Sequence, residues 1–229
     1  SYAFLWDGCE NNTGTGRLEI YSSIFGTGVN LVKSGTGFLD LRGLAASYTG
    51  STSINGGTMQ LSGVNDALPT ATALTINNGM LALNGRSQTV GSLSGSSLAT
   101  IDHLGADTTL TVNQGANTTF AGVIKNTAGS LSFVKGGTGA LTLSGINTYT
   151  GGTILNGGTL TVGTGGTLGA TTGTLAVNNT NTGAGTAVVL NLATGVDTTT
   201  GSLSGTVVTP SSLTNSATIN NGGLATTFT

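Results

Sequence analysis

The chain has little of what most proteins use for chemistry or for electrostatic binding. Charged residues make up 6% of its 229 positions, against about 25% in an average globular domain. The six basic residues are scattered, so the chain lacks the basic footprint that nucleic acids and anionic membranes require. No run approaches the roughly 18 apolar residues of a membrane-spanning helix. We therefore expect no nucleic-acid binding and no membrane insertion.

Cysteine, histidine and proline are almost absent, with one, one and two copies. A lone Cys9 excludes an internal disulfide framework, leaving a small, partly buried side chain or a covalent link to another copy. One cysteine and one histidine cannot form a structural zinc site, and no Asp follows the Gly-Gly pairs as calcium-binding repeats require. "GGTG" at 136–139 lacks the Gly-Lys-Ser/Thr of a phosphate-binding loop. We expect no metal and no cofactor.

Glycine, by contrast, fills 40 positions. Gly/Ser/Thr richness is typical of flexible linkers, but disordered chains are usually poor in hydrophobic residues and highly charged. This chain is 37% hydrophobic, has a mean hydropathy of +0.22 and spaces its aliphatic residues regularly. These features favour a folded protein.

Short apolar-alternating runs recur along the chain, such as "ALTLSG", "GTLTVG" and "MLALNG". Alternation with period two predicts strands that bury one face. Asn-Gly, Gly-Gly and Gly-Thr-Gly segments separate these runs and supply the positive-φ positions of tight turns. No stretch shows a 3.6-residue period with caps. The chain is therefore expected to be all-β with little or no helix.

One pattern occurs twice, at 31–63 and 133–163. Each copy has Lys, Gly-Thr-Gly, an alternating run, Tyr-Thr-Gly, Asn-Gly-Gly-Thr and a second run, at an offset of 102 and then 101 residues. Weaker similarity continues downstream, with insertions near 180–185 and 207–211. We predict two tandem units of about 100 residues, 31–111 and 133–229, after an N-terminal cap or strand-donor segment at 1–30.

Many short strands could form a sandwich, a barrel, a propeller or a solenoid. Tandem repetition, recurrent Asn-Gly-Gly-Thr turns and the 5% content of aromatic residues favour the solenoid. We predict a right-handed parallel β-helix of roughly eleven rungs, assuming about 20 residues per coil. Its narrow interior should leave little room for large rings. The expected corner residues are Gly35, Gly37, Asn55, Gly56, Gly57, Gly137, Gly139, Asn156, Gly157 and Gly158. Matching asparagines, such as Asn55 with Asn156 and Asn77 with Asn178, should stack as amide ladders.

Residues 135–160 closely resemble the passenger-associated repeat of bacterial autotransporters and related large surface proteins, "K-x-G-x-G-x-L-x-L-x-G-x-N-x-Y-x-G-G-T-x-[ILV]-x-x-G-x-L". Residues 33–59 match it with substitutions, since Ala45 or Ala46 replaces the Asn before Tyr48 and Ser51 replaces a glycine. "LWDG" at 5–8 is similar to an element that opens such repeat regions. The resemblance implies a β-helical passenger that is secreted or displayed on a bacterial surface.

No catalytic residues are expected. A Ser–His–Asp site would need His103, but adjacent strand residues point to opposite faces, so Asp102 is poorly placed to orient it. The second unit has Asn220 and Asn221 at these positions. Asp7 with Glu10, and Asp102 with Asp107, are the closest acidic pairs and are interpreted as turn residues. We see no cluster of acidic or aromatic residues that would mark one outer face, and we predict that the protein is not an enzyme.

The two ends are the expected places of assembly. Aromatic residues alternate in "SYAFLW", and the second unit stops in mid-pattern, so the chain is either a piece of a longer passenger or a rod completed by another subunit. We predict assembly contacts through Tyr2, Phe4, Trp6 and Phe228. The sequons at Asn11, Asn117 and Asn178 matter only in a host that glycosylates.

The predicted function is structural. We expect a low-charge extracellular or cell-surface rod of a bacterium that assembles end to end into a filament or forms part of an adhesin. Its expected partners are copies of itself and, in an adhesin, host or surface glycans. The alternative is a carbohydrate-binding or polysaccharide-degrading β-helix protein, which clustered acidic or aromatic residues on one outer face would indicate.

Overall fold

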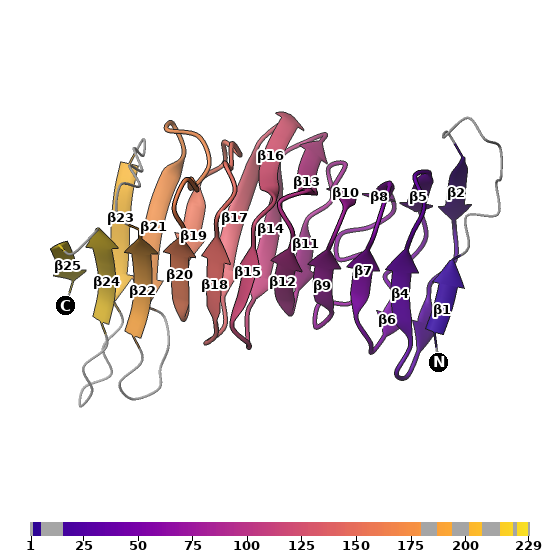
Figure 1. The fold of residues 1–229 in the computed structure, drawn as a ribbon, viewed down its shortest axis with the longest axis horizontal. Coiled ribbons are helices and arrows are strands. Elements are labelled where there is room, and N and C mark those ends of the chain that lie inside the picture. Colours follow the sequence, from indigo (N-terminus) through magenta and orange to yellow (C-terminus); the bar gives the residue numbers. More distant parts are fainter. Residues whose placement is uncertain are drawn as a thin grey trace.

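The computed structural model describes residues 2–5, 16–179, 187–193, 202–207, 216–221 and 224–228. These residues form strands, turns and irregular segments, and no helix occurs among them. Within this part of the chain, no helix is long and apolar enough to cross a membrane. The strands stack into an elongated array in chain order (Figure 1), so the prediction of an all-β parallel solenoid is confirmed.

The longest face, sheet A, runs the whole length of this array (Figure 1). Its strands pair in parallel until the last one, β25, which pairs antiparallel with β24. In spatial order sheet A contains β1 (Tyr2–Leu5), β4 (Asn30–Lys33), β7 (Thr52–Ile54), β9 (Ala73–Ile76), β12 (Ser92–Gly95), β15 (Thr118–Phe120), β18 (Ala140–Leu143), β20 (Thr159–Val162), β22 (Ala187–Leu192), β24 (Ser216–Asn221) and β25 (Leu224–Phe228).

Two shorter faces, sheets B and D, overlap only near the middle. Sheet B contains β2 (Arg17–Ile20), β5 (Phe38–Leu41), β8 (Thr58–Leu61), β10 (Gly79–Ala82), β13 (Ala99–Leu104) and β16 (Val123–Ala128). Sheet D contains β11 (Gln88–Val90), β14 (Thr108–Asn113), β17 (Leu131–Gly136), β19 (Thr153–Leu155), β21 (Thr174–Asn179) and β23 (Ser202–Val207). A small sheet C joins β3 (Phe25–Gly26) to β6 (Ser47–Tyr48).

The predicted number of about eleven coils is wrong. Residues 16–179 contain seven strands of sheet A and about seven turns. Register partners in sheet A lie 19 residues apart at Leu141 and Leu160, but 30 apart at Leu160 and Leu190. The coils are longer than the assumed 20 residues because irregular segments and insertions, such as the one expected near 180–185, widen them.

Alternation places aliphatic side chains inside the coils. In β20, Leu160 and Val162 are buried, while Thr159 and Thr161 are half-buried. The interior also holds four large rings, Tyr48, Phe120, Phe133 and Tyr149, contrary to the expectation of little room. Glycine provides the space: a Cβ on Gly95, the register partner of Phe120, would lie 2.8 Å from that ring.

The two sequence copies occupy different faces of the solenoid. The first places β4 and β7 in sheet A and β5 and β8 in sheet B. The second places β17 and β19 in sheet D and β18 and β20 in sheet A. The second copy is therefore displaced by one face around the axis, so an outer face presented by one copy is not repeated by the other.

Candidate functional site

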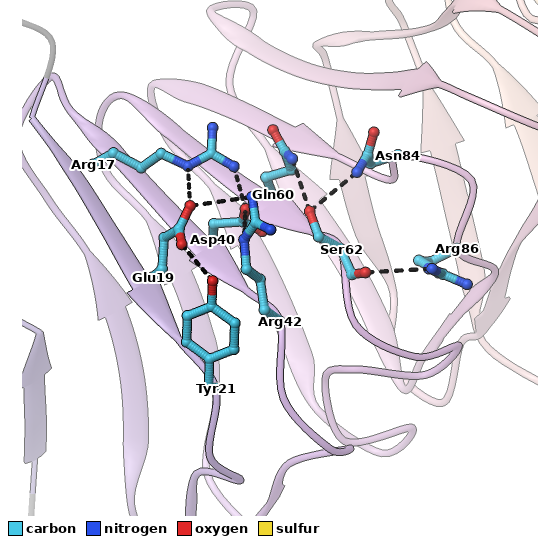
Figure 2. Close-up of polar contacts among 9 residues, drawn as sticks. All are labelled: Arg17, Glu19, Tyr21, Asp40, Arg42, Gln60, Ser62, Asn84 and Arg86. Atoms are coloured by element: carbon cyan, nitrogen blue, oxygen red, sulfur yellow. Dashed lines mark hydrogen bonds and ion pairs between the residues drawn. The ribbon is translucent and has the colours of Figure 1, made fainter.

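Charged side chains gather on the outer face of sheet B near its first strands. The parallel register aligns Glu19 on β2, Asp40 on β5 and Gln60 on β8 in one row. Arg17 on β2 and Arg42 just after β5 flank this row (Figure 2). We call Arg17, Glu19, Tyr21, Asp40 and Arg42 the charged cluster. The expectation that no outer face gathers acidic or aromatic residues is therefore wrong, because strands 21 residues apart in sequence become neighbours.

Each arginine of the charged cluster bridges both carboxylates. Arg17 Nε donates to Glu19 Oε1 at 2.9 Å and its Nη2 donates to Asp40 Oδ2. Arg42 Nε donates to Asp40 Oδ2 at 2.8 Å, and its Nη2 lies 3.1 Å from Glu19 Oε1. Tyr21 donates its hydroxyl proton to Glu19 Oε2 at 2.7 Å, and Arg42 lies over the Tyr21 ring. Two positive and two negative charges cancel within the cluster.

Asp40 is the least solvated member of the cluster. Its side chain is 0% exposed, whereas those of Arg17 and Arg42 are 37% and 36% exposed. Its Oδ1 atom has no hydrogen-bond partner among the described residues. A buried carboxylate is tolerated only when paired, so the two arginines keep Asp40 in place.

The electrostatics of the cluster do not suit acid catalysis. The hydrogen bond from Tyr21 is the largest cause that lowers the pKa of Glu19, and the two arginines add to it. The same hydrogen bond raises the pKa of Tyr21. A glycosidase general acid must instead stay protonated near neutral pH. The geometry therefore fits binding or cross-linking of coils better than glycosidic cleavage.

A thinner polar track continues from the charged cluster over the next coils (Figure 2). Gln60 donates to Ser62 Oγ at 2.8 Å, and Asn84 donates to the same atom at 3.0 Å. Arg86 donates from Nη2 to the Ser62 carbonyl at 3.4 Å. Further along the sheet, Lys125 pairs with Asp102 at 3.2 Å.

The lysine that opens each repeat is buried at a corner. Lys33 and Lys135 are 3% and 0% exposed. Lys135 Nζ donates to the carbonyls of Gly136, Gly137 and Gly157 at 2.6, 3.3 and 3.1 Å. Lys33 makes the same three kinds of bond, to Ser34, Gly35 and Gly56. Burial lowers the pKa of Lys135 to about 8, so at neutral pH the ammonium still supplies three donors. Sequence reasoning singled out these lysines as pattern members but missed this role.

The predicted corner residues lie where these lysines bind. Gly35 and Gly137 have φ of 73° and 72°, and Gly57 and Gly158 both have φ of 62°. A Cβ on Gly158 would lie 2.5 Å from the Gly139 carbonyl oxygen of the neighbouring coil. Gly56 and Gly157 carry carbonyls that accept from the lysines, while Gly37 accepts from the Thr58 amide.

The asparagines expected to stack do form amide contacts. Asn77 Nδ2 donates to Asn55 Oδ1 at 2.8 Å, and Asn178 Nδ2 donates to Asn156 Oδ1 at 3.3 Å. Asn220 and Asn191 make a third such contact at 2.7 Å. The predicted amide ladders are thus confirmed as pairs across neighbouring coils.

The repeat tyrosine and threonine form a buried pair that sequence reasoning missed. The Tyr149 hydroxyl lies 2.6 Å from Thr153 Oγ1, and Tyr48 makes the same contact with Thr52. Both tyrosines are buried. The identical four-residue spacing in the two copies was the available signal.

The remaining predicted residues fall at the edges of what the structure describes. Tyr2 and Phe4 lie on β1, which pairs in parallel with β4, and Phe228 lies on β25. Trp6, Cys9 and the Asp7–Glu10 pair lie outside the described residues. Predicted assembly through these residues stays a prediction.

Asp102 and His103 diverge as the strand geometry requires. Asp102 accepts hydrogen bonds from the Thr127 amide at 3.0 Å and the Thr127 hydroxyl at 2.8 Å. His103 is buried, and its Nδ1 accepts from the Gly85 amide. Among the described residues, no three His, Cys, Asp or Glu side chains are grouped so as to hold a metal ion.

Comparison with known proteins identifies the repeated pattern. Residues 31–61 and 133–162 match the family model of the passenger-associated-transport-repeat. Searches of the curated proteins and of the solved structures gave no match. The predicted resemblance is therefore confirmed for two segments of this chain, one at the corner between sheets A and B and the other at the corner between sheets D and A.

Proposed function

We propose that the protein is a structural rod that assembles end to end, as a filament or as the stalk of an adhesin. The repeat and the β-solenoid fit an autotransporter passenger-type surface protein of bacteria. One observation carries the structural role: the polar side chains that the repeat specifies are used inside the molecule. Lysine, tyrosine, threonine and asparagine bind their own or neighbouring coils. The repeat thus builds length and presents no reactive group of its own.

End-to-end stacking is supported by the geometry of sheet A. Its outermost described strands are β1 and β25, and a strand edge with unpaired backbone groups is a template for association. The solenoid is a sum of local contacts between neighbouring coils. A coil from a second molecule could therefore continue the stack without a new kind of interface.

The test is negative-stain electron microscopy of the purified full chain, with sedimentation velocity over a range of concentrations. We expect rods that lengthen as concentration rises. Monomeric particles at every concentration would contradict the assembly, while compact particles of non-rod shape would contradict the structural role itself.

A second function, binding of an uncharged glycan, is favoured by the charged cluster. The second repeat has Thr142 and Ser144 where the first has Asp40 and Arg42, so the repeat does not need these charges. Tyr21 is 68% exposed beside Glu19 and both arginines, which offers an aromatic face next to hydrogen-bonding groups. Because the four charges cancel, the cluster has no net attraction for an acidic or basic polymer.

The second repeat supplies the variant for this test. Asp40→Thr with Arg42→Ser installs the residues of the second copy and should leave folding intact. Tyr21→Ala removes the exposed ring. Affinity electrophoresis against neutral polysaccharides should show retardation of the natural protein that both variants lose. Retardation that both variants keep, or none in any of the three, would reject glycan binding at this cluster.

A further inference from the structure

The only histidine of the chain occupies an inner corner at mid-rod. His103 lies near the end of β13, where the chain passes from sheet B to sheet D. It faces inward, 0% exposed, on the same side as Ile101. The strand register shifts between His103 and Leu104. The imidazole therefore fills an irregular corner rather than a regular rung.

Three glycines stack beside this imidazole, one from each of three successive coils. A Cβ on Gly105 would lie 2.8 Å from the Gly85 amide nitrogen. A Cβ on Gly129 would clash with the Gly105 carbonyl and lie 3.0 Å from His103 Nε2. The ring is thus enclosed by backbone, which cannot rearrange as an exposed side chain would.

The hydrogen bonds of the ring favour the uncharged imidazole. The Gly85 amide donates to Nδ1 at 3.4 Å, so Nδ1 carries no proton and Nε2 carries it. Nε2 is buried and has no partner among the described residues. A second proton would have to enter at Nδ1, directly opposite the N–H of Gly85. Two donors would then face each other in a site closed to water.

Charged groups near the corner are committed elsewhere. Asp102, on the opposite face of β13, binds Thr127 and Lys125. Asp107 accepts from the Ser130 amide at 2.9 Å, and Arg86 donates to Ser62. No carboxylate in the described part of the chain is bonded to His103. A charged imidazole would therefore be buried without a counter-ion, which costs several kcal/mol on general grounds.

We propose that His103 makes the corner between β13 and β14 a proton-sensitive point of the rod. Acidification opens this corner locally, while the coils on either side remain stacked through sheet A. The open corner takes up the proton that the closed corner rejects, so opening becomes easier as pH falls. The second unit has Asn221 at the corresponding position, so the sensitivity is confined to one place.

Amide hydrogen exchange of the full chain, read by NMR at about pH 7.5 and about pH 5 and corrected for intrinsic rates, tests this proposal. Protection of the Gly85 and Leu104 amides should fall by about tenfold for each pH unit below about 6.5, the range in which an exposed histidine is protonated. Amides of β20 should keep their protection. In His103→Gln the fall should disappear, and in Asp107→Asn, a control in the same corner, it should persist.

Two results would overturn the proposal. One is equal protection of Gly85 at both pH values in the natural chain, and the other is the same fall in His103→Gln. If His103→Gln does not fold, the imidazole C–H resonance of the natural protein decides, because a lone histidine is unambiguous. Titration of that resonance near pH 6.5 with the corner still protected would show that the closed corner accepts the proton.

Discussion

At the scale of single residues, the buried lysines of the two repeats join backbone carbonyls from two coils. Each Nζ donates to two carbonyls in its own turn and one in the next coil. A lysine is almost never buried without partners. Here the partners are carbonyls that a tight corner turns inward and that would otherwise lack donors.

Replacing Lys135 by methionine should remove these donors while keeping the aliphatic stem. Three buried carbonyls would lose a charged donor, so we expect a loss of about 3 kcal/mol in the free energy of unfolding, measured by urea denaturation. Lys125→Met, which removes a partly exposed ion pair, should cost about 1 kcal/mol or less. Equal losses in the two variants would refute the corner role of Lys135.

Tyr48 gives a prediction for alkaline pH. Burial raises the pKa of Tyr48 to about 12, against 10.0 for an exposed tyrosine. The folded protein therefore favours the neutral phenol, and the resulting stability is complete below pH 10 and lost as pH rises toward 12. Two pKa units correspond to about 3 kcal/mol. Urea denaturation between about pH 9 and about pH 12 should show this loss in the natural chain and a smaller one in Tyr48→Phe, and parallel curves would contradict it.

At the scale of elements, the corners decide whether strands can stack. Gly158 combines a left-handed φ of 62° with a carbonyl 2.5 Å from where its Cβ would be. Gly158→Ala should therefore lower the unfolding free energy by about 2 kcal/mol or more. Gly115→Ala, with nothing within 4 Å of the added carbon, should change it by about 0.5 kcal/mol or less. Thermal unfolding of both variants checks this, and a tolerated Gly158→Ala would show that the corner is adaptable.

Strand identity followed from alternation, but the assignment of strands to faces did not. The runs "ALTL" and "TLTV" lie in β18 and β20 as predicted from their period. Yet the matching runs of the first copy lie on sheet B rather than sheet A. The repeat fixes a strand–corner–strand unit, and the length of the irregular segments between units sets the face on which it falls.

At the scale of the whole molecule, the assembly proposal concerns the first residues of the chain. β1 pairs with β4 in parallel, so residues 1–6 include one outer strand of sheet A. Deleting residues 1–6 should expose β4 as the edge and change the length distribution of rods in electron microscopy. Rods that polymerise unchanged would contradict a role for Tyr2, Phe4 and Trp6 in assembly. Deleting the loop residues 115–116 instead is a matched control, which should shift stability without altering an outer strand.

The sequence alone determined the fold class, the repeat, its corner glycines and its stacked asparagines, because these depend on local backbone geometry and on a period that neighbouring coils share. Only the tertiary structure decided the rest. It brought Glu19 next to Asp40 and both next to two arginines, because parallel register joins residues about one coil apart. It turned the second repeat by one face and enclosed His103 between three glycines. These outcomes depend on the exact residue count of each coil, which alternation and turn signals do not encode.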